Sequence, residues 1–339
     1  MNPLFKRTPL AAGILLALSS PVFSPKVIAA QGDPVLDEFS VNSTTLNSQQ
    51  DSSIAMDADG DFVIAWTSNL QDGDGDGIYA QRYTADGSPA GTEFRVNSTT
   101  LNSQFAPSIA MDADGDFVIA WTSHLQDGDG YGIYAQRYTA DGSPAGIEFP
   151  VNSYTTNDQR NPSIAMDADG DFVIAWQSAG QEDPDSVDVS IYAQRYTADG
   201  SPAGIEFPVN SYTTNDQRNS SIAMDADGDF VIAWESYGKD TSDSYGIFAQ
   251  RYSANGNEVA GEFPVNSTTD LDQSAPSIAM DADGDFVIAW ESKSIDTTWD
   301  VYAQRFSADG STVGSEFRVN STTDFDQFVP SIAMDADGD

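Results

Sequence analysis

The sequence predicts an all-β protein, a β-propeller-like array of four-stranded antiparallel blades with about 55 residues per blade. Val, Ile, Phe, Tyr and Trp fill short segments that Gly, Asp, Asn, Ser and Pro separate, and no stretch shows a helical period. The main observation is a repeat. Met-Asp-Ala-Asp-Gly-Asp recurs at intervals of 54 to 58 residues, starting at Met56, Met111, Met166, Met224, Met280 and Met334.

Each unit is expected to contain four strands. The last of them mixes polar and apolar side chains on each face, which suits an outer strand. In the second copy we expect strands at residues 93–97, 107–113, 116–123 and 132–139.

The hairpin between the second and third strands predicts a register. Asp114-Gly115 suits a two-residue type I′ turn, because Gly accepts the positive φ that this turn requires. Such a turn would pair Asp112 with Phe117 and Met111 with Val118. Both faces of the hairpin are then apolar, which indicates sheets stacked face to face.

The repeat length favours a propeller over the alternatives. Separate β-sandwich modules need about 100 residues each, and β-solenoid coils are shorter than this period. Five complete blades and the start of a sixth are visible, and an end inside the last hairpin turn predicts a fragment of a longer protein. A single repeat domain is expected at 38–339, with units at 38–92, 93–147, 148–205, 206–261, 262–315 and 316–339.

The first thirty residues read as a secretory signal peptide. Lys6 and Arg7 precede an apolar run at 10–18, and small residues lead to a cleavage site after Ala29 or Ala30. Residues 31–37 would form a short lead into the repeats. No later segment is apolar enough to span a membrane, so a secreted, cell-surface or periplasmic product is expected.

Composition excludes several classes of function. The chain has 53 Asp and Glu against 14 Lys and Arg, for a formal net charge of -39. Such a chain repels nucleic acid. With no Cys and one His, disulfide frameworks, thiolate zinc sites and His-based centres are not expected.

The units resemble a class of bacterial tandem repeats found in large secreted or surface proteins. The resemblance rests on Ile-Tyr-Ala-Gln-Arg-Tyr at 78–83, Thr-Ala-Asp-Gly at 84–87 and Glu-Phe-Arg-Val-Asn at 93–97. It implies a propeller-like fold and an extracellular setting, often beside calcium-binding or adhesin-like modules. The glycine-rich nonapeptides of those calcium-binding neighbours are absent here.

The hairpin turns are candidate calcium sites, because calcium favours several closely spaced oxygen ligands. Asp-x-Asp-Gly-Asp differs from an EF-hand loop, however, since Gly stands fourth and no Glu closes the site. The alternative is a solvated turn that keeps one rim soluble. The candidate ligands are Asp57, Asp59, Asp61, Asp112, Asp114, Asp116, Asp167, Asp169, Asp171, Asp225, Asp227, Asp229, Asp281, Asp283 and Asp285.

A second candidate calcium site lies in the first loop between strands three and four. Asp72, Asp74 and Asp76 match the start of a calcium loop, but Tyr83 stands where the closing ligand would be. Later copies of this loop diverge, so no repeated site is expected there.

Variable loops over a constant scaffold indicate binding. The loops between strands three and four should share one face with the Asn-Ser-Thr-Thr loops, and an extracellular protein or glycan is the expected partner. Near-identical units offer no singular catalytic set. We therefore expect a non-enzymatic surface-binding or adhesion module. The alternative is a secreted glycan-active hydrolase or lyase.

Two repeated side chains are expected to be structural. The Trp that ends each third strand should pack between adjacent sheets. The Arg of each Ala-Gln-Arg segment should be a partner for the surrounding carboxylates. The arginines are Arg82, Arg137, Arg195, Arg251 and Arg305.

Overall fold

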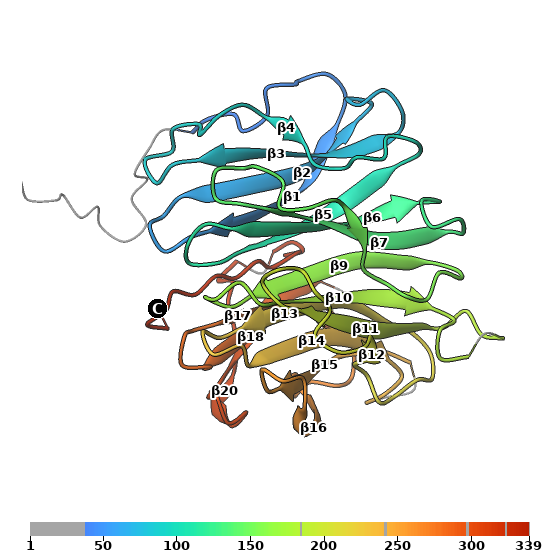
Figure 1. The fold of residues 1–339 in the computed structure, drawn as a ribbon. Coiled ribbons are helices and arrows are strands. Elements are labelled where there is room, and N and C mark those ends of the chain that lie inside the picture. Colours follow the sequence, from blue (N-terminus) through green and yellow to red (C-terminus); the bar gives the residue numbers. More distant parts are fainter. Residues whose placement is uncertain (1–37, 184, 241–242, 296–297, 323, 339) are drawn as a thin grey trace, which may run out of the picture. The chain divides into compact units, whose positions relative to one another are not determined.

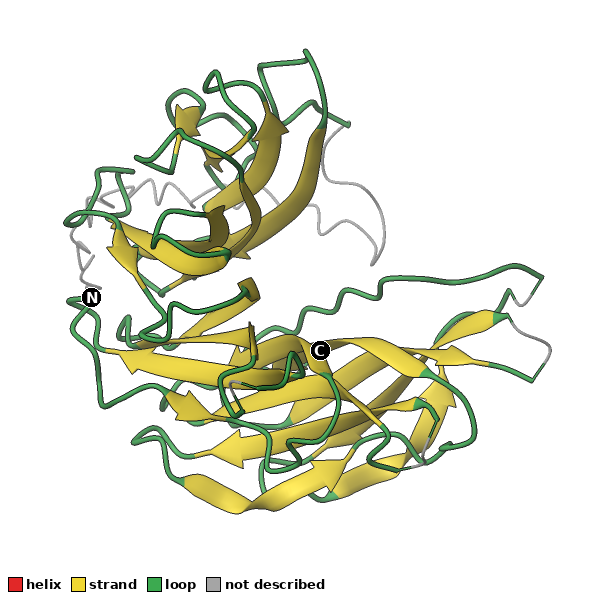
Figure 2. Cartoon of the chain, turned by 90° about the vertical axis from the view of Figure 1, so that its right-hand side faces the viewer, coloured by secondary structure: helices red, strands yellow, loops and turns green. Residues whose placement is uncertain are grey.

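The computed structural model describes residues 38–339, except 184, 241–242, 296–297, 323 and 339. The predicted signal peptide and lead therefore lie outside the described residues. The described chain consists of strands and loops and contains no helix (Figure 2). Accordingly, none of the described residues form a helix that is long and apolar enough to cross a membrane.

Among the described residues, twenty strands form five antiparallel sheets that follow one another along the sequence (Figure 1). The first sheet contains β1 (Gln49–Met56), β2 (Phe62–Asn69), β3 (Asp76–Tyr83) and β4 (Phe94–Arg95). The second contains β5 (Gln104–Met111), β6 (Phe117–His124), β7 (Tyr131–Tyr138) and β8 (Phe149–Pro150). The third contains β9 (Gln159–Met166), β10 (Phe172–Ala179), β11 (Val189–Tyr196) and β12 (Phe207–Pro208). The fourth contains β13 (Gln217–Met224), β14 (Phe230–Tyr237), β15 (Tyr245–Tyr252) and β16 (Glu258–Pro264). The fifth contains β17 (Gln273–Met280), β18 (Phe286–Lys293), β19 (Trp299–Phe306) and β20 (Thr312–Arg318).

Each sheet takes its outermost strand from the segment that opens the next repeat. Phe94 of Glu-Phe-Arg-Val-Asn pairs with Ala80 of β3, so this segment completes the first sheet. The sequence pattern placed it first in its own unit, ahead of the hairpin. The four strands per unit are confirmed, but the sheets are out of phase with the repeats as we divided them.

The predicted hairpin register is wrong by one residue. Met111 pairs with Phe117 and Ile109 with Ile119, around a five-residue connection rather than a two-residue turn. The Asp112 N–H donates to the Asp116 carbonyl at 2.9 Å, which closes this wider loop. Because side chains alternate along a strand, the shift places the large residues on one face and the small ones on the other.

Adjacent sheets pack by setting a large-residue face against a small-residue face. Ile109, Phe117, Ile119 and Trp121 of the second sheet form one core cluster with Val63 and other residues of the first sheet. The Trp prediction is confirmed, since Trp121, Trp176 and Trp234 are fully buried. The first strands of successive sheets contact one another, β1 with β5, β5 with β9, and onward. The array is therefore propeller-like, although the sheets are not closed into a ring.

The repeated arginines join successive repeats through backbone carbonyls. Arg137 donates from Nη1 to the Asp199 carbonyl and from Nη2 to the Ala198 carbonyl, both at 2.5 Å. Arg82, Arg195 and Arg251 make the same kind of contact. None of the ion pairs found in the described chain involves them. The expected carboxylate partners are confirmed only as nearby charges, at Asp141, Asp199 and Asp309: the guanidinium hydrogen bonds go to turn carbonyls of the neighbouring repeat.

Candidate functional site

The acidic hairpin turns are held by the carboxylate that opens each turn. In the third repeat, Asp167 Oδ1 accepts the backbone N–H of Asp169 at 3.0 Å and of Asp171 at 2.9 Å. The last carboxylate of the turn faces elsewhere, because Asp171 Oδ1 accepts the Ala198 N–H at 2.8 Å. The first Asp caps its turn in the same way in the other repeats, at Asp57, Asp112, Asp225 and Asp281.

The three carboxylates of one turn therefore have different roles. The middle Asp is exposed in each repeat, at Asp59, Asp114, Asp169, Asp227 and Asp283. The last one reaches the next turn of its own sheet, at Asp61, Asp116, Asp171, Asp229 and Asp285.

The second predicted calcium loop is also dispersed among separate partners. Asp72 Oδ2 accepts the Asn97 amide at 3.3 Å, Asp74 Oδ2 accepts the Asn102 N–H at 3.1 Å, and Asp76 Oδ1 accepts the Asn69 amide at 2.9 Å. Across the described residues, no three His, Cys, Asp or Glu side chains are grouped so that they could hold a metal. Calcium binding at either set of carboxylates stays a prediction.

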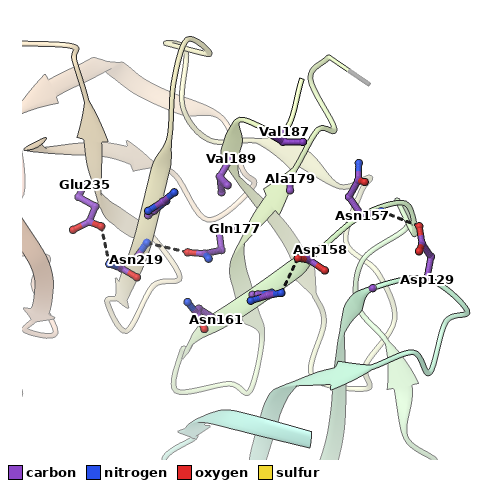
Figure 3. A pocket seen from close by; sticks show the side chains of 13 residues that line it. Asp129, Asn157, Asp158, Asn161, Gln177, Ala179, Val187, Val189, Asn219 and Glu235 are labelled. Carbon is purple, nitrogen blue, oxygen red and sulfur yellow. Dashed lines mark hydrogen bonds and ion pairs between the residues drawn. The ribbon is translucent and has the colours of Figure 1, made fainter. Parts of the chain in front are cut away.

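The variable loops do lie beside the Asn-Ser loops, as predicted. Asp74 in the variable loop of the first repeat accepts the N–H of Asn102 in the Asn-Ser loop of the second, and Asp129 Oδ2 of the second accepts the Asn157 N–H of the third at 3.2 Å. At this face a cavity of about 650 Å³ opens across the second to fourth sheets (Figure 3). It is lined by Asp129, Gly130, Asn157, Asp158, Arg160, Asn161, Gln177, Ala179, Val187, Val189, Arg218, Asn219 and Glu235.

A backbone bulge in the first strand of each sheet positions several of these side chains. The first strand of each sheet bulges at a residue with positive φ, 53° at Asn161, 52° at Asn219 and 50° at Ala275. The N–H of that residue turns toward the previous sheet, where a side chain accepts it. The acceptor is Thr122 for Asn161, Gln177 for Asn219, and Glu235 for Ala275, at 3.1 to 3.3 Å.

The acceptor position changes from repeat to repeat, although the preceding Phe-Val-Ile-Ala-Trp and the following Ser are constant. It carries Thr, Thr, Gln, Glu and Glu, at Thr67, Thr122, Gln177, Glu235 and Glu291. Any of these side chains can accept one hydrogen bond, so the fold tolerates the variation. The cavity therefore has a lining that occurs once in the chain. We expected no catalytic set because the units are nearly identical, but the units differ at this position.

Glu235 is the most perturbed acid of the cavity. The residue is 5% exposed, and its two oxygens accept the Asn219 amide at 2.7 Å and the Ala275 N–H at 3.2 Å. Burial raises the pKa of this carboxyl, while the two hydrogen bonds and the Arg218 guanidinium oppose the rise. A carboxyl that retains its proton to higher pH can donate that proton.

Two guanidinium groups also line the cavity, and that of Arg218 belongs to the residue paired with Glu235 on the neighbouring strand. Arg160 pairs with Asp158 at 2.7 Å and lies over the Tyr131 ring, 4.0 Å from its centre. Arg218 pairs with Asp216, which belongs to the same loop-to-strand segment. The Arg160 Nε is buried and has no hydrogen-bond partner in the described chain. The cavity thus combines an acid, two cations and amide groups.

The sequence did not predict this cavity, because the candidate site residues were chosen mainly from positions that are constant among the repeats. Gln177 and Glu235 stand inside the repeated Phe-Val-Ile-Ala-Trp strand, one residue after Trp176 and Trp234. The available signal was the change of residue type at the position after the Trp. Its significance depends on the bulge, which the repeat pattern alone does not reveal.

No known protein family and no curated protein matches this sequence. Solved structures do resemble it. A protein of unknown function from Dyadobacter fermentans DSM 18053 has a TM-score of 0.56 and 13% identity, over 80% of this chain and 83% of that one. The Hadza microbial sialidase Hz136 has a TM-score of 0.51 and 12% identity, over 81% of this chain and 59% of that one. At this level of identity the likeness concerns the fold.

Proposed function

We propose that this chain is a secreted glycan-active hydrolase or lyase on a β-propeller scaffold, with its site in the 650 Å³ cavity. The observation that carries the proposal is Glu235, a buried carboxyl of raised pKa at a cavity whose lining occurs once in the chain. A general acid of this kind is what cleavage of a glycosidic bond requires.

The cavity lining suits a sugar. Its volume lies in the usual range for small-ligand sites, about 300 to 1,000 Å³. Asn161, Gln177 and Asn219 offer amide donors and acceptors that match hydroxyl groups. A structural neighbour is a sialidase by name, so one protein of similar fold carries a glycan-cleaving site.

In the proposed hydrolysis, protonated Glu235 transfers its proton to the glycosidic oxygen as the bond from that oxygen to the anomeric carbon breaks, and water bonds to this carbon and releases a proton to solvent. In a lyase the bond from the oxygen to C4 would break instead, with a double bond forming between C4 and C5 as the C5 proton passes to solvent. Arg218 then lies where it can stabilise the carboxylate that remains, since it already opposes the rise of this pKa. Asn219 donates to the same carboxyl at 2.7 Å and fixes its orientation. The cavity residues thereby provide the acid and its positioning groups.

A second function has one observation in its favour. Both Glu235 oxygens already accept hydrogen bonds from the fold, and Glu291 caps the next bulge through the Val329 N–H at 2.5 Å. Glu235 would then be structural only, and the cavity would belong to a binding module for an extracellular glycan or protein. This is the function that we first expected from the sequence.

One substitution separates the two functions. Glu235→Gln keeps an acceptor for the Ala275 N–H but cannot act as an acid, so it should retain glycan binding and lose cleavage at least a hundredfold. Glu291→Gln is the matched control, because it changes the equivalent residue outside the cavity lining. The assay measures binding and reducing-end release over a panel of neutral and acidic polysaccharides. Binding without release by the unchanged protein would favour the binding module.

Export belongs to the same proposal, and calcium stabilisation stays a prediction of the sequence with a structural alternative beside it. The signal-peptide pattern supports export to the cell surface, the medium or the periplasm. The spacing of the turn carboxylates supports calcium as a stabilising ion, while their hydrogen bonds to backbone N–H groups support a purely structural role.

A further inference from the structure

A glutamate near the outermost strand holds the loop that follows the second strand in each of the first three sheets. In the first sheet Glu93 Oε1 accepts the Gln71 amide at 2.5 Å, and Oε2 accepts the Ser43 N–H at 2.6 Å. The second and third sheets make the same two contacts. The Ser68 hydroxyl bonds to the same glutamine at 2.6 Å, so one hydrogen-bond network joins the loop to the strand.

The fourth sheet has an amine in place of this glutamine. Lys239 stands where the first three sheets have Gln, and its Nζ contacts Glu262 Oε1. The glutamate side chain is 6% exposed and the lysine side chain is 21% exposed. The Ser236 hydroxyl, equivalent to the one that bonds to the glutamine, has no hydrogen-bond partner among the described residues. The lysine therefore costs the network one hydrogen bond and brings a nucleophile against a buried carboxyl.

The fold already activates the Glu262 carboxyl toward a nucleophile. Its Oε2 accepts the Ser211 N–H at 2.9 Å and the Ser211 hydroxyl at 2.7 Å. Two donors on one oxygen stabilise the negative charge that this oxygen gains when the carbon is attacked. Because the other oxygen contacts Nζ, the amine and the carboxyl are held together before any reaction, which is the main advantage of an intramolecular step.

A second carboxyl, that of Asp240, follows the lysine in the chain. Both of its oxygens are buried, and no hydrogen bond to them is found in the described part of the chain. Burial raises the pKa of Asp240, although the nearby Asn266 amide and Lys239 oppose the rise. Burial also lowers the pKa of Lys239 to about 8, and the Phe248 ring lies over its Nζ, 4.3 Å from the ring centre. The surroundings thus favour a neutral amine beside a neutral acid.

We propose that Lys239 and Glu262 form an isopeptide bond within the chain. One proton first passes from Nζ to Glu262 Oε1, and the neutral amine attacks the carboxyl carbon, so that the C–N bond forms as Oε2 becomes negative. Asp240 then gives its proton to the Oε1 hydroxyl, which leaves as water as the C–Oε1 bond breaks. Asp240 regains a proton from the nitrogen. The products are one amide and one water, and nothing is oxidised or reduced.

The bond would tie the loop after β14 to β16 covalently, in a chain that contains no Cys. It would also replace a buried pair of charges, which is costly to desolvate, with a neutral amide. Oε2 becomes the carbonyl oxygen of that amide and keeps its two donors from Ser211. The proposal does not depend on any glycan-cleaving activity.

Mass spectrometry of the intact chain provides the first test. The unchanged protein should be lighter by one water than the mass calculated from its measured N-terminus. Lys239→Gln introduces the residue of the first three sheets, so it should fold alike, as circular dichroism would check, and should have its full calculated mass. Lys293→Arg changes the lysine that pairs with Asp272 and is the control, so it should still lose the water.

The position of the bond gives the decisive result, because an Asp-Gly succinimide would also lose one water. Trypsin should not cut at Lys239, and tandem mass spectrometry should find residues 219–251 joined to residues 252–293. An unchanged protein of full calculated mass would overturn the proposal. So would cleavage at Lys239, or a loss of water that persists in Lys239→Gln.

A further variant tests the part played by Asp240. Asp240→Asn keeps the size of the side chain but cannot carry the proton, so the linked fraction should grow about a hundredfold more slowly, as measured by mass from the time of synthesis. Linkage at the unchanged rate would overturn the role assigned to this carboxyl.

Discussion

At the scale of single residues, one position serves both the fold and the candidate site. The residue after each repeated Trp caps a backbone bulge, and Thr67, Gln177 and Glu235 all satisfy that requirement. The fold requires a hydrogen-bond acceptor at this position, and the acceptor can be neutral or charged. A carboxyl at this position is held at the cavity by the fold itself, which is how a binding or catalytic group is kept in place.

The turn carboxylates make a residue-scale prediction about stability. Asp167→Ala removes the acceptor for two backbone N–H groups and should destabilise the protein by about 1 kcal/mol. Asp167→Asn keeps an acceptor and should be far milder. Urea unfolding of both variants at pH 7 checks this, and equal losses for Ala and Asn would show that the charge, and not the hydrogen bonding, matters.

The same carboxyl gives a pH dependence. Burial raises the pKa of Asp167 above its ordinary value of 3.8, so the folded protein holds this proton more tightly than the unfolded one. Ionising Asp167 therefore costs stability. The cost is absent below pH 3.8 and complete above the folded pKa. The stability of Asp167→Asn relative to the unchanged protein should rise through this window, as measured by urea unfolding from pH 3 to 7.

The opposite shift occurs one turn away. The Thr197 hydroxyl donates to Asp199 at 2.7 Å and, with Ser201, lowers the pKa of this carboxyl to about 2. Its contribution to stability is present above pH 3.8 and is lost as the pH falls through about 2. Thr197→Val should move this pKa toward 3.8 in a carbon-detected NMR titration. Thr139→Val should shift Asp141 and leave Asp199 unchanged, as the matched control.

At the scale of strands and sheets, the repeat pattern predicted the strands well and their register poorly. The apolar and aromatic residues of these segments, and the turn residues between them, predicted the bounds of β6 and β7 to within one residue. The register depended on the turn, and Asp-Gly was read as a two-residue connection. Asp112 instead closes a wider loop through its carboxylate, a contact that depends on side-chain geometry. The outermost strand was assigned to the wrong sheet, because a periodic sequence does not show whether a segment pairs within its own repeat or with the preceding one.

The site was predictable only in its location. Variation among the loops indicated the face that bears the cavity, since Asp129 and Val187 of those loops line it. The acid did not follow from the sequence, because the burial that raises its pKa arises between two sheets. Of the turn carboxylates that the sequence did single out, the first caps its own turn, the middle one is exposed and the last bonds to the following turn of its sheet.

The bond between sheets makes a prediction at this scale. Ser163→Ala leaves the Ile222 N–H without its acceptor inside the packed interface. The loss should be about 1 to 3 kcal/mol, the usual cost of an unsatisfied donor away from water. Ser331→Ala changes the equivalent residue where it is exposed, and should leave the unfolding midpoint unchanged in dilute protein. Similar losses for both variants would point to an effect within the strand.

At the scale of the whole molecule, the charge of -39 is concentrated by the repeat. Each sheet contributes the same acidic turn, and the cations that face those turns bind carbonyls instead of carboxylates. Like charges thus accumulate at one end of every sheet. Self-repulsion of this kind lowers the stability of the compact state, and salt relieves it. Sodium chloride should therefore raise the melting temperature.

Divalent ions separate screening from binding. The first and last carboxylates of each turn accept different backbone N–H groups, and the middle one is exposed, so the three do not converge. Calcium and magnesium chloride at equal ionic strength should therefore raise the melting temperature equally. Calcium favours flexible sites of six to eight oxygens, which magnesium does not share. A larger shift for calcium, saturating with concentration, would mean that the turns rearrange around the ion. Asp169→Asn, which changes an exposed carboxylate without a structural contact to the turn, should then abolish part of the excess. If the ions act alike, that variant should raise the melting temperature slightly in low salt, because it removes one of the repelling charges.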